Sequence, residues 1–399
     1  MLDAVIDIPI ANRNPGLAQI DSSSLEFPLG GNESSLRSVF GIHDSSERGS
    51  QQRGKPKCEE YSYQPKNILV TGSAGFIGCN FVRLVLQNNQ DVNIVSLDKL
   101  TYAGNPQNLA SLPNEKQHTL IVGDICDRSL VDKLLRDYQI DTIVHFAAES
   151  HVDRSITGPA DFMQTNIIGT FTLLEAARNY WLEEKQYTSN QCRFHHISTD
   201  EVYGDLGPND APFTEDSPYK PSSPYSASKA SSDHLVRAYI RTYNLPATIS
   251  NCSNNYGPYQ HLEKLIPTVI RSCIEQKPIP VYGNGSNVRD WLYVEDHCHA
   301  IWKILNEGKI GETYNIGGDC EVDNLSLVKM ICNIMDEKIA SNKSCDNLIT
   351  FVTDRPGHDW RYAIDSQNLK EKLLWSPQTI LYVGLHATLL YFIGQWGIK

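Results

Sequence analysis

Closely spaced cysteine pairs are missing from this sequence, although it contains ten cysteines in 399 residues. No two of them form a C-x-x-C pair, a spacing that structural zinc sites often use. Disulfide frameworks are typical of short secreted chains rather than of a chain this long. We therefore expect no metal site, reduced thiols and a cytoplasmic protein.

Long apolar runs and a positive charge balance are missing as well. No apolar run has the roughly 20 residues that a membrane-spanning helix needs, and the start MLDAVIDIPIANRNPG lacks the basic-then-apolar pattern of a secretion signal. Lys and Arg total 35 against 47 for Asp and Glu, which gives a formal net charge of −12. This balance argues against a nucleic acid or an anionic membrane as the main partner.

Most of the chain has the composition of a globular protein, with 40% hydrophobic and 21% charged residues overall. Residues 1–64 differ, because they are rich in Ser, Gly, Asn and Arg and have only short apolar patches. A segment of this composition buries too little apolar surface to fold alone. We expect a disordered extension at 1–64 and an ordered chain from Lys66 onward.

A glycine-rich turn follows the first predicted strand. NILVTG at 67–72 has the pattern of a buried parallel strand, and Gly72, Gly75 and Gly78 then lead into an amphipathic helix. Glycine permits a tight turn close to a pyrophosphate, and the helix N-terminus presents N–H groups to it. The next predicted strand ends at Asp98, about twenty residues after Gly78, where an acid typically binds the ribose. This pattern favours NAD over NADP.

Strands and helices alternate from there. Further strands are predicted in TLIVGD, DTIVHFAAES, FHHIS and PATISNCS, with a long helix at about 161–182 among the helices between them. This alternation implies a Rossmann-type doubly wound parallel sheet. Beyond about residue 254 the regular alternation of strands and helices ends, which indicates a smaller, partly interleaved substrate lobe. The expected division is 65–252 with 291–318 for the nucleotide-binding domain, and 253–290 with 319–399 for the lobe.

The stretch 194–239 carries the residue types of a proton-transfer site. FHHISTDEVYGDL presents Thr199, Asp200 and Glu201 at the carboxyl end of a strand, where ligands bind in open α/β sheets. SPYSASKASSDHLVRAY begins a helix on which Tyr225 and Lys229 lie one turn apart. An ammonium beside a phenol lowers the phenol's pKa from about 10 and makes it a better base. The plainer alternatives are a surface Tyr–Lys pair and acids that only cap a turn.

Four cationic residues stand out in the second half of this acidic chain: Lys264, Arg289, Arg355 and His358. They are either solvated surface charges or ligands for a diphosphate at the carboxyl edge of the sheet.

Several longer motifs resemble those of one family. TGSAGFIG, LDKLTYAGN, FAAESHVDRSI, FHHISTDEVYGDL, SPYSASKASSDHLVRAY, NCSNNYGPY, VRDWLYVEDH and DRPGHD are similar to the dTDP-glucose 4,6-dehydratases, which are extended short-chain dehydrogenases. The resemblance covers about 66–365 and fades after Pro377. Nucleotide-sugar epimerases resemble the chain elsewhere but lack both carboxylates of the Thr-Asp-Glu triplet.

The resemblance implies a role for each residue of the site. Tyr225, helped by Thr199 and Lys229, resembles the base that takes the 4-hydroxyl proton while hydride passes from carbon 4 to NAD. Glu201 matches the base that removes the proton at carbon 5. Asp200 matches the acid that protonates the departing 6-hydroxyl. Hydride then returns to carbon 6 and a proton goes back to carbon 5, so NAD is recycled. Two carboxylates in different protonation states are what an elimination of water requires.

The resemblance also implies two sets of binding residues. With the glycines and the Tyr–Lys pair, the cofactor set comprises Phe76, Ile77, Asp98, Lys99, Leu100, Thr101, Asp124, Ile125, Ala147, Ala148, Thr165 and Asn255. With Thr199, the substrate set comprises Ser150, Asn254, Lys264, Leu265, Pro280, Tyr282, Arg289, Asn324, Arg355 and His358. The chain departs from the family pattern at Trp360, at His261-Leu262 and in its more apolar C-terminal helix.

The sequence thus predicts an NAD-dependent 4,6-dehydratase of dTDP-glucose. Family members are usually homodimers joined through helices near 161–182 and 225–243, so we expect a homodimer. Three alternatives stay open: the same reaction on UDP-glucose, a 4-epimerase, and a catalytically silent NAD-binding scaffold. The residues do not distinguish thymine from uracil. The Thr-Asp-Glu triplet argues against the epimerase. The intact triplet together with Tyr225 and Lys229 argues against the silent scaffold.

Overall fold

The structure is a computed structural model that describes residues 63–338, 344–354 and 357–396. These described residues belong to one compact unit. Residues 1–62 of the expected extension lie outside the described residues, as does Arg355. Tyr63, which the expected extension included, is buried, and its hydroxyl is 2.7 Å from the Thr142 Oγ1. The packed chain therefore begins before Lys66.

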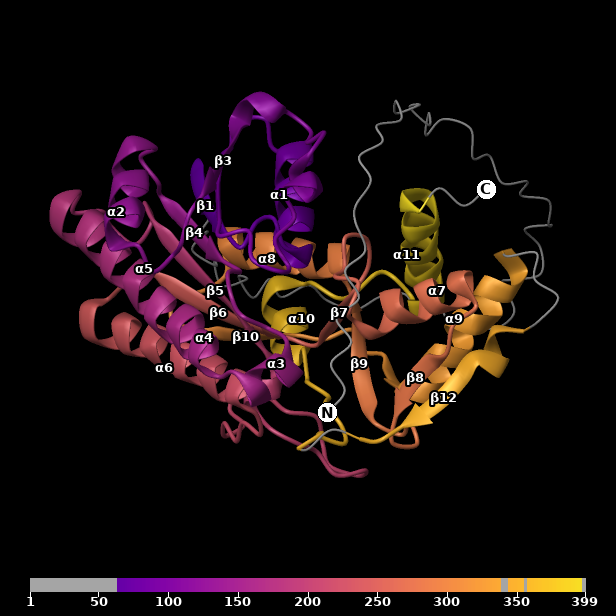
Figure 1. The fold of residues 1–399 in the computed structure, drawn as a ribbon. Coiled ribbons are helices and arrows are strands. Elements are labelled where there is room, and N and C mark those ends of the chain that lie inside the picture. The colour runs from indigo at the N-terminus through magenta and orange to yellow at the C-terminus, as the bar shows by residue number, and fades with distance from the viewer. Residues whose placement is uncertain (1–62, 339–343, 355–356, 397–399) are drawn as a thin grey trace, which may run out of the picture. The chain divides into compact units, whose positions relative to one another are not determined.

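A seven-stranded parallel sheet organises the first part of the fold (Figure 1), and its strand order is β10-β6-β5-β4-β1-β2-β3. The strands are β1 (Asn67–Thr71), β2 (Asn93–Asp98), β3 (His118–Val122), β4 (Thr142–His145), β5 (Arg193–Thr199), β6 (Ala247–Cys252) and β10 (Thr313–Ile316). The order reverses between β1 and β4, which makes the sheet doubly wound. The predicted fold class is confirmed.

Side chains of the strands alternate between two apolar cores, one on each face of the sheet. Ile68 and Val70 pack with α1 (Phe76–Asn88), α8 (Val294–Glu307) and α10 (Gln367–Leu373). Leu69 packs on the opposite face with α2 (Arg128–Asp137), α5 (Thr170–Ala177) and α6 (Pro224–Tyr243). Both faces are covered, which explains why these strands are almost continuously apolar.

The long helix predicted at about 161–182 is present, but it is not uniformly α-helical. It consists of α4 (Ala160–Phe162), the π-helical η3 (Met163–Gly169), α5 and the π-helical η4 (Arg178–Glu184). Within η3, the Asn166 amide nitrogen donates to the Glu149 carbonyl and to Ser228 Oγ. The π-helical segment thus ties the loop after β4 to α6, and both of these border the site described below.

The second part of the fold has a core of its own. It contains a sheet of order β11-β9-β7 and a pair β12-β8. These strands are β7 (Asn254–Tyr256), β8 (Ile279–Tyr282), β9 (Val288–Tyr293), β11 (Glu321–Asp323) and β12 (Ile349–Val352), and the packed helices are α7 (Leu265–Glu275), α9 (Asn324–Lys338) and α11 (Leu381–Gln395). The chain leaves the large sheet after β6 and returns to it at β10, so the two parts interleave.

Short elements complete the fold: α3 (Val152–Thr157) and the 3-10 turns η1 (Pro106–Leu109), η2 (Glu115–Gln117), η5 (Asp200–Val202) and η6 (Cys345–Leu348). Within the described ranges, no helix is long and apolar enough to cross a membrane. The same ranges contain no group of three or more His, Cys, Asp and Glu residues suited to holding a metal ion.

Candidate functional site

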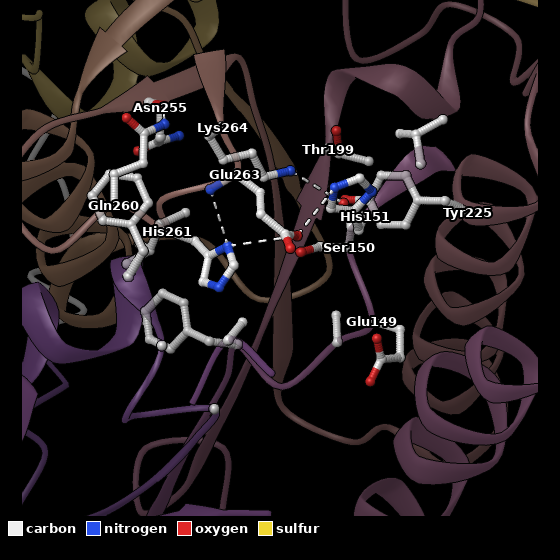
Figure 2. A pocket seen from close by; sticks show the side chains of 18 of the residues that line it. Glu149, Ser150, His151, Thr199, Tyr225, Asn255, Gln260, His261, Glu263 and Lys264 are labelled. Atoms are coloured by element: carbon white, nitrogen blue, oxygen red, sulfur yellow. Dashed lines mark hydrogen bonds and ion pairs between the residues drawn. The ribbon is translucent and has the colours of Figure 1, made fainter. Parts of the chain in front are cut away.

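A cavity of about 560 Å³ lies at the carboxyl edge of the large sheet. Its walls come from the turns after β1, β2, β4 and β5, from the start of α6, and from the second part of the chain around β7, α7, β8 and β9. This is the edge at which ligands bind in open α/β sheets. Figure 2 shows side chains of both parts converging on it.

The glycine turn forms one end of the cavity. Gly72 has φ +69°, and a Cβ there would lie 2.6 Å from the Ala147 nitrogen. A Cβ at Gly78 would lie 2.4 Å from the Gly72 carbonyl oxygen. Only glycine therefore allows β1, the loop after β4 and the start of α1 to approach this closely. No side chain caps the N-terminus of α1, so its N–H groups remain available to a phosphate.

Asp98 fixes the end of β2 against the glycine turn. It is buried, and its carboxylate accepts from the backbone nitrogens of Ala74 (2.9 Å) and Leu100 (2.8 Å). Burial raises its pKa, and the two backbone bonds oppose that rise. The neighbouring Lys99 is paired with Asp124 at 2.8 Å. An acceptor-rich carboxylate thus lies beside the glycine turn, as ribose binding requires.

The proposed chemistry centres on the end of β5 and the first turns of α6. Thr199 is the last residue of β5, and its hydroxyl donates to Asp200 Oδ1 at 3.2 Å. A capping box formed by Ser223 and Ser226 fixes the start of α6. This places Tyr225 in the first helical turn, where it is buried and hydrogen-bonded to Thr199.

Asp200 has the surroundings of a carboxylic acid that keeps its proton. Its side chain is 2% exposed, and its pKa is raised well above the usual value by burial, then by the charges of Glu201 and Asp290. Asp200 Oδ2 is buried, with no hydrogen-bond partner among the described residues. The geometry therefore leaves a buried carboxyl oxygen available to a ligand in the cavity.

Tyr225 and Lys229 correct one expectation. The pKa of Tyr225 is raised well above 10, first by burial and then by the Glu201 charge. Lys229 donates to the Ile197 carbonyl at 2.7 Å, and burial lowers its pKa to about 8. The Tyr225 pKa is thus not lowered overall as expected, because burial outweighs the interactions that oppose it.

Nearly all the predicted binding residues line the cavity. On the cofactor side these are Gly72, Gly75, Phe76, Ile77, Gly78, Asp98, Lys99, Thr101, Asp124, Ile125, Ala147, Ala148, Thr165, Tyr225, Lys229 and Asn255. On the substrate side they are Ser150, Thr199, Asn254, Lys264, Leu265, Pro280, Tyr282, Arg289, Asn324 and His358. Leu100 is not part of the wall: it has φ 55°, and its side chain packs against the core beneath α1.

The cationic residues are not solvated surface charges where the structure describes them. Arg289 is 5% exposed and donates to the carbonyls of Val288 (2.7 Å) and Asp359 (3.0 Å) while its guanidinium lies over the Tyr362 ring. Lys264 and His358 line the same cavity. The backbone carbonyl of Trp360 also accepts from Arg289, at 3.3 Å.

One group of residues escaped the sequence analysis. We call it the Glu263 cluster: Glu263, Arg154, His151, His261 and Tyr102. Figure 2 shows Glu263 between His261 and His151, with Lys264 directed toward Ser150. Both Glu263 carboxylate oxygens lie 3.0 Å from an Arg154 nitrogen, and the Arg154 guanidinium lies 3.9 Å from the Tyr102 ring centre. These residues come from the loop after β2, from the end of the loop after β4 with α3, and from the loop before α7, so no local pattern marks them as a group.

The doubly wound sheet, the glycine turn and the Thr–Tyr–Lys site together define an extended short-chain dehydrogenase fold. Residues 69–388 match the family model described as GDP-mannose 4,6 dehydratase. The dTDP-glucose 4,6-dehydratase 1 of Escherichia coli K12 is 53% identical over 336 residues, which covers 82% of this chain and 93% of that protein. The enzyme of Haemophilus influenzae is 51% identical over 331 residues, covering 82% and 98%.

Solved structures agree with this. The dTDP-glucose 4,6-dehydratase of Bacillus anthracis, in complex with NAD, has a TM-score of 0.74 at 42% identity and covers 83% of this chain and 98% of its own. That of Streptomyces venezuelae, with NAD and dTDP bound, has a TM-score of 0.75 at 43% identity, with the same coverage. The chain belongs to the dTDP-glucose 4,6-dehydratase family.

Proposed function

We propose that this chain converts dTDP-glucose into dTDP-4-keto-6-deoxyglucose and water with bound NAD. The observation that carries the proposal is the pair Asp200 and Glu201 beside Tyr225 in one cavity, because this pairing suits an elimination rather than an oxidation alone. The relatives named above bear the same activity in their names.

The residues at the glycine end of the cavity fit NAD. The close approaches at Gly72 and Gly78, the open N-terminus of α1 and the Asp98 carboxylate form a cradle for a dinucleotide. The related structures from Bacillus anthracis and Streptomyces venezuelae contain bound NAD. When bound, NAD supplies the hydride acceptor for carbon 4 and returns that hydride at carbon 6.

The residues of the chain divide the proton transfers among themselves. Tyr225 takes the proton of the 4-hydroxyl. Burial raises the pKa of Tyr225 in this structure, and the interaction of Tyr225 with the Thr199 hydroxyl opposes that rise. Glu201 removes the proton at carbon 5, which the new 4-ketone acidifies, and a proton goes back to carbon 5 when hydride is returned to carbon 6. Asp200 protonates the departing 6-hydroxyl, and burial, which raises its pKa, favours the protonated form that this step needs.

The substrate's diphosphate would lie near Arg289, Lys264 and His358. Arg289 is held in the wall by backbone carbonyls, so its guanidinium is ordered before a ligand arrives. Ordered guanidinium groups suit phosphate oxygens because they offer several donors in a fixed plane. Arg355, the fourth cation of this set, lies outside the described residues.

A 4-epimerase is the alternative that the fold leaves open. The UDP-glucose 4-epimerase of Thermotoga maritima shares the fold, with a TM-score of 0.73 at 27% identity. One assay separates the candidates: purified protein receives dTDP-glucose or UDP-glucose, and the 4-keto sugar is followed by its alkaline absorbance. A 4-keto product from dTDP-glucose supports the proposal. A preference for UDP-glucose changes the substrate, and an epimer without a 4-keto product overturns the dehydratase assignment.

We also propose a homodimer joined through α5 and α6, with η3. Large apolar side chains are exposed along these helices at Met163 (37%), Ile168 (45%), Phe171 (43%) and Tyr243 (44%). Burying such a stripe against a second copy would remove apolar surface from water. The expected cytoplasmic location stays a prediction.

A further inference from the structure

His297 is a fully buried histidine that the proposed chemistry does not use. Its side chain is 0% exposed and does not line the cavity. It lies in the first turn of α8, which begins directly after β9. Because β9 pairs with β7, with Leu292 opposite Asn255, the start of α8 lies beside Asn255. His297 Nδ1 is 2.9 Å from Asn255 Oδ1.

The side-chain amide of Asn255 has a defined orientation. Asn255 lines the cavity, and Figure 2 shows it near Gln260 on the side opposite Tyr225. Its amide nitrogen donates to the Ser253 carbonyl at 3.0 Å. A carbonyl oxygen only accepts, so the amide nitrogen must face Ser253 and the amide oxygen must face His297. Gln260 Nε2 donates to the Asn255 backbone carbonyl at 2.9 Å, which holds the main chain as well.

The same hydrogen bonds place the proton of the His297 ring. Burial lowers the pKa of His297 to about 3, so the ring is neutral near pH 7 and carries a single N–H. The amide oxygen of Asn255 only accepts, so this N–H must be at Nδ1. Nε2 is then an acceptor, and it is buried with no hydrogen-bond partner among the described residues. A proton on Nε2 would leave a buried donor unpaired and turn two acceptors toward each other, which costs more.

This arrangement leaves a donor of Asn255 on the cavity side. Burial raises the pKa of the Cys252 thiol to about 12, and a hydrogen bond from the Asn255 side chain opposes that rise. Cys252 also lines the cavity. Sulfur is a weak acceptor, so a ligand oxygen would be a stronger partner for the same N–H. A flipped amide would present an acceptor there and would lose its bonds to both Ser253 and His297.

We propose that His297 is a positioning residue that holds the Asn255 amide with its N–H toward the cavity, where it donates to an oxygen of the bound dinucleotide. The inference rests on the proposed function for the identity of that ligand. The orientation of the ring and of the amide follows from the hydrogen bonds of α8 and β7 alone.

Three substitutions separate the donor of His297 from its ring. His297→Phe keeps a ring and removes the donor. His297→Asn keeps a donor, because its amide nitrogen takes about the place of Nδ1. His297→Leu has the same branching as His297→Asn but no donor, and it takes the place of His297→Phe where that variant does not fold.

His195→Phe is the matched control. His195 is also buried, and its ring nitrogens lie 2.8 and 3.0 Å from the hydroxyls of Thr248 and Ser250, but it does not line the cavity. Both ring variants should lower thermal stability, because each leaves polar groups unpaired in the interior. Only the substitution at His297 should change cofactor binding.

The ring tautomer is measured first, without added ligand. Protein labelled with ¹⁵N-histidine is studied by NMR, and the His297 signals are assigned by their loss in His297→Asn. We expect a protonated Nδ1 and an unprotonated Nε2 at neutral pH. A proton on Nε2 overturns the inference, because the ring could then not donate to Asn255.

The rate at which bound NAD is lost is the second readout. Holoprotein is dialysed against buffer without NAD, and the nucleotide that remains is measured by chromatography after denaturation. We expect His297→Phe to lose NAD about three- to tenfold faster than the parent, since a lost hydrogen bond weakens affinity by about that factor and mainly through dissociation. His297→Asn should lie closer to the parent, and His195→Phe should match it. An unchanged rate in His297→Phe, or an equal rate in His195→Phe, overturns the inference.

Asn255→Ala tests whether His297 acts through the amide. In that background His297→Phe has no amide to orient, so it should not accelerate the loss of NAD further. An equal acceleration in both backgrounds assigns His297 to the packing of α8 and overturns the inference. A parent that holds NAD but makes no 4-keto sugar contradicts the proposed function, and the two readouts still decide the role of His297. A parent that binds no NAD contradicts both.

Discussion

Asp200 and Glu201 are neighbours in sequence but differ in their surroundings. Asp200 is 2% exposed and bonded to Thr199, whereas Glu201 is half-buried and its charge raises the pKa of both Asp200 and Tyr225. A like charge beside a carboxyl favours the protonated form, so the pair separates into an acid and a base. Asp200 is therefore suited to act as the acid and Glu201 as the base because only Asp200 is fully buried.

The first prediction at the residue scale separates the two halves of the reaction. Tyr225→Phe should form almost no bound NADH, because the 4-hydroxyl keeps its proton. The double variant Asp200→Asn with Glu201→Gln should still oxidise carbon 4 and then stall, since loss of general acid–base help costs about 100- to 10,000-fold. Stopped-flow absorbance near the reduced nicotinamide band would show the stalled species.

Exchange of the carbon 5 hydrogen with solvent provides the control. It should collapse in the double variant and also in Tyr225→Phe, since no ketone forms there to acidify that hydrogen. A double variant that makes 4-keto-6-deoxy sugar at the parent rate would reduce the two carboxylates to caps of the turn after β5.

The second prediction concerns Arg289. Arg289→Ala should weaken binding of the nucleotide sugar more than it slows turnover at saturation. Loss of a hydrogen bond to a charged group costs about 1.5–3 kcal/mol, which corresponds to a roughly tenfold or larger increase in Kd. Isothermal titration with dTDP would measure it.

Arg193→Ala is the matched control for Arg289→Ala. Arg193 is also buried and donates to a backbone carbonyl, that of Gly308 at 2.9 Å, but it lies outside the cavity. Both variants should lower thermal stability, and only Arg289→Ala should change affinity. Equal affinities would assign Arg289 to loop structure alone.

At the scale of elements, the sequence correctly predicts those helices and strands whose positions are set by local residue patterns. The strands β1 to β6 follow from apolar runs, and the start of α6 follows from Ser223 and Pro224, which form its cap and first residue. The three-residue strands β7 and β11 were missed because they are too short to show a period. The π-helical segments have no distinctive amino-acid composition, so they could not be predicted.

Contacts between distant residues could not be predicted. The bond from Lys229 to the Ile197 carbonyl, and the carbonyls that hold Arg289, depend on how β5, α6 and β9 are placed in three dimensions. Periodicity fixes only which side of an element a residue occupies. The family resemblance supplied the cavity residues that local patterns did not, and the correction at Tyr225 arose because its burial was unknown.

The third prediction belongs to the elements that meet in the Glu263 cluster. Glu263 directly precedes Lys264 and α7, Arg154 lies on α3, and Tyr102 follows β2. The cluster therefore links the cofactor side of the cavity to the substrate side. Glu263→Gln should raise KM several-fold with a smaller change in kcat, because loss of an exposed ion pair costs about 0.2–1 kcal/mol and the network adds to it.

Arg136→Ala with Glu184→Gln removes another exposed ion pair, which links α2 to η4 outside the cavity. This control should leave KM unchanged. Arg154→Lys keeps the charge but loses the planar contact with Tyr102, so it should fall between the parent and Glu263→Gln. A KM in Glu263→Gln that matches the parent would show that the cluster does not couple the two sides.

At the scale of the whole molecule, the proposed dimer gives the fourth prediction. Phe171→Glu places a charge in the exposed apolar stripe of α5 and should convert the protein to a monomer in sedimentation equilibrium. Leu390→Glu on α11 is the control, because Leu390 is also exposed, at 59%, but lies on a different helix. A monomeric parent, or a dimer that survives Phe171→Glu, contradicts the proposed interface.

The fifth prediction follows from the placement of the cavity between the large sheet and the second part of the chain. A cofactor that is regenerated in each turnover need not leave, so protein purified without added NAD should release NAD or NADH on denaturation and be active without a supplement.

Asp98→Asn should retain less bound NAD than the parent, by roughly tenfold or more, because an amide loses the charge-assisted bond to the ribose. Added NAD should restore its activity. Chromatography of the released nucleotide measures occupancy, and Asp296→Asn serves as the control for a buried carboxylate outside the cavity. Activity that depends on NADP and ignores NAD would contradict the role assigned to Asp98, since a carboxylate there repels a 2′-phosphate.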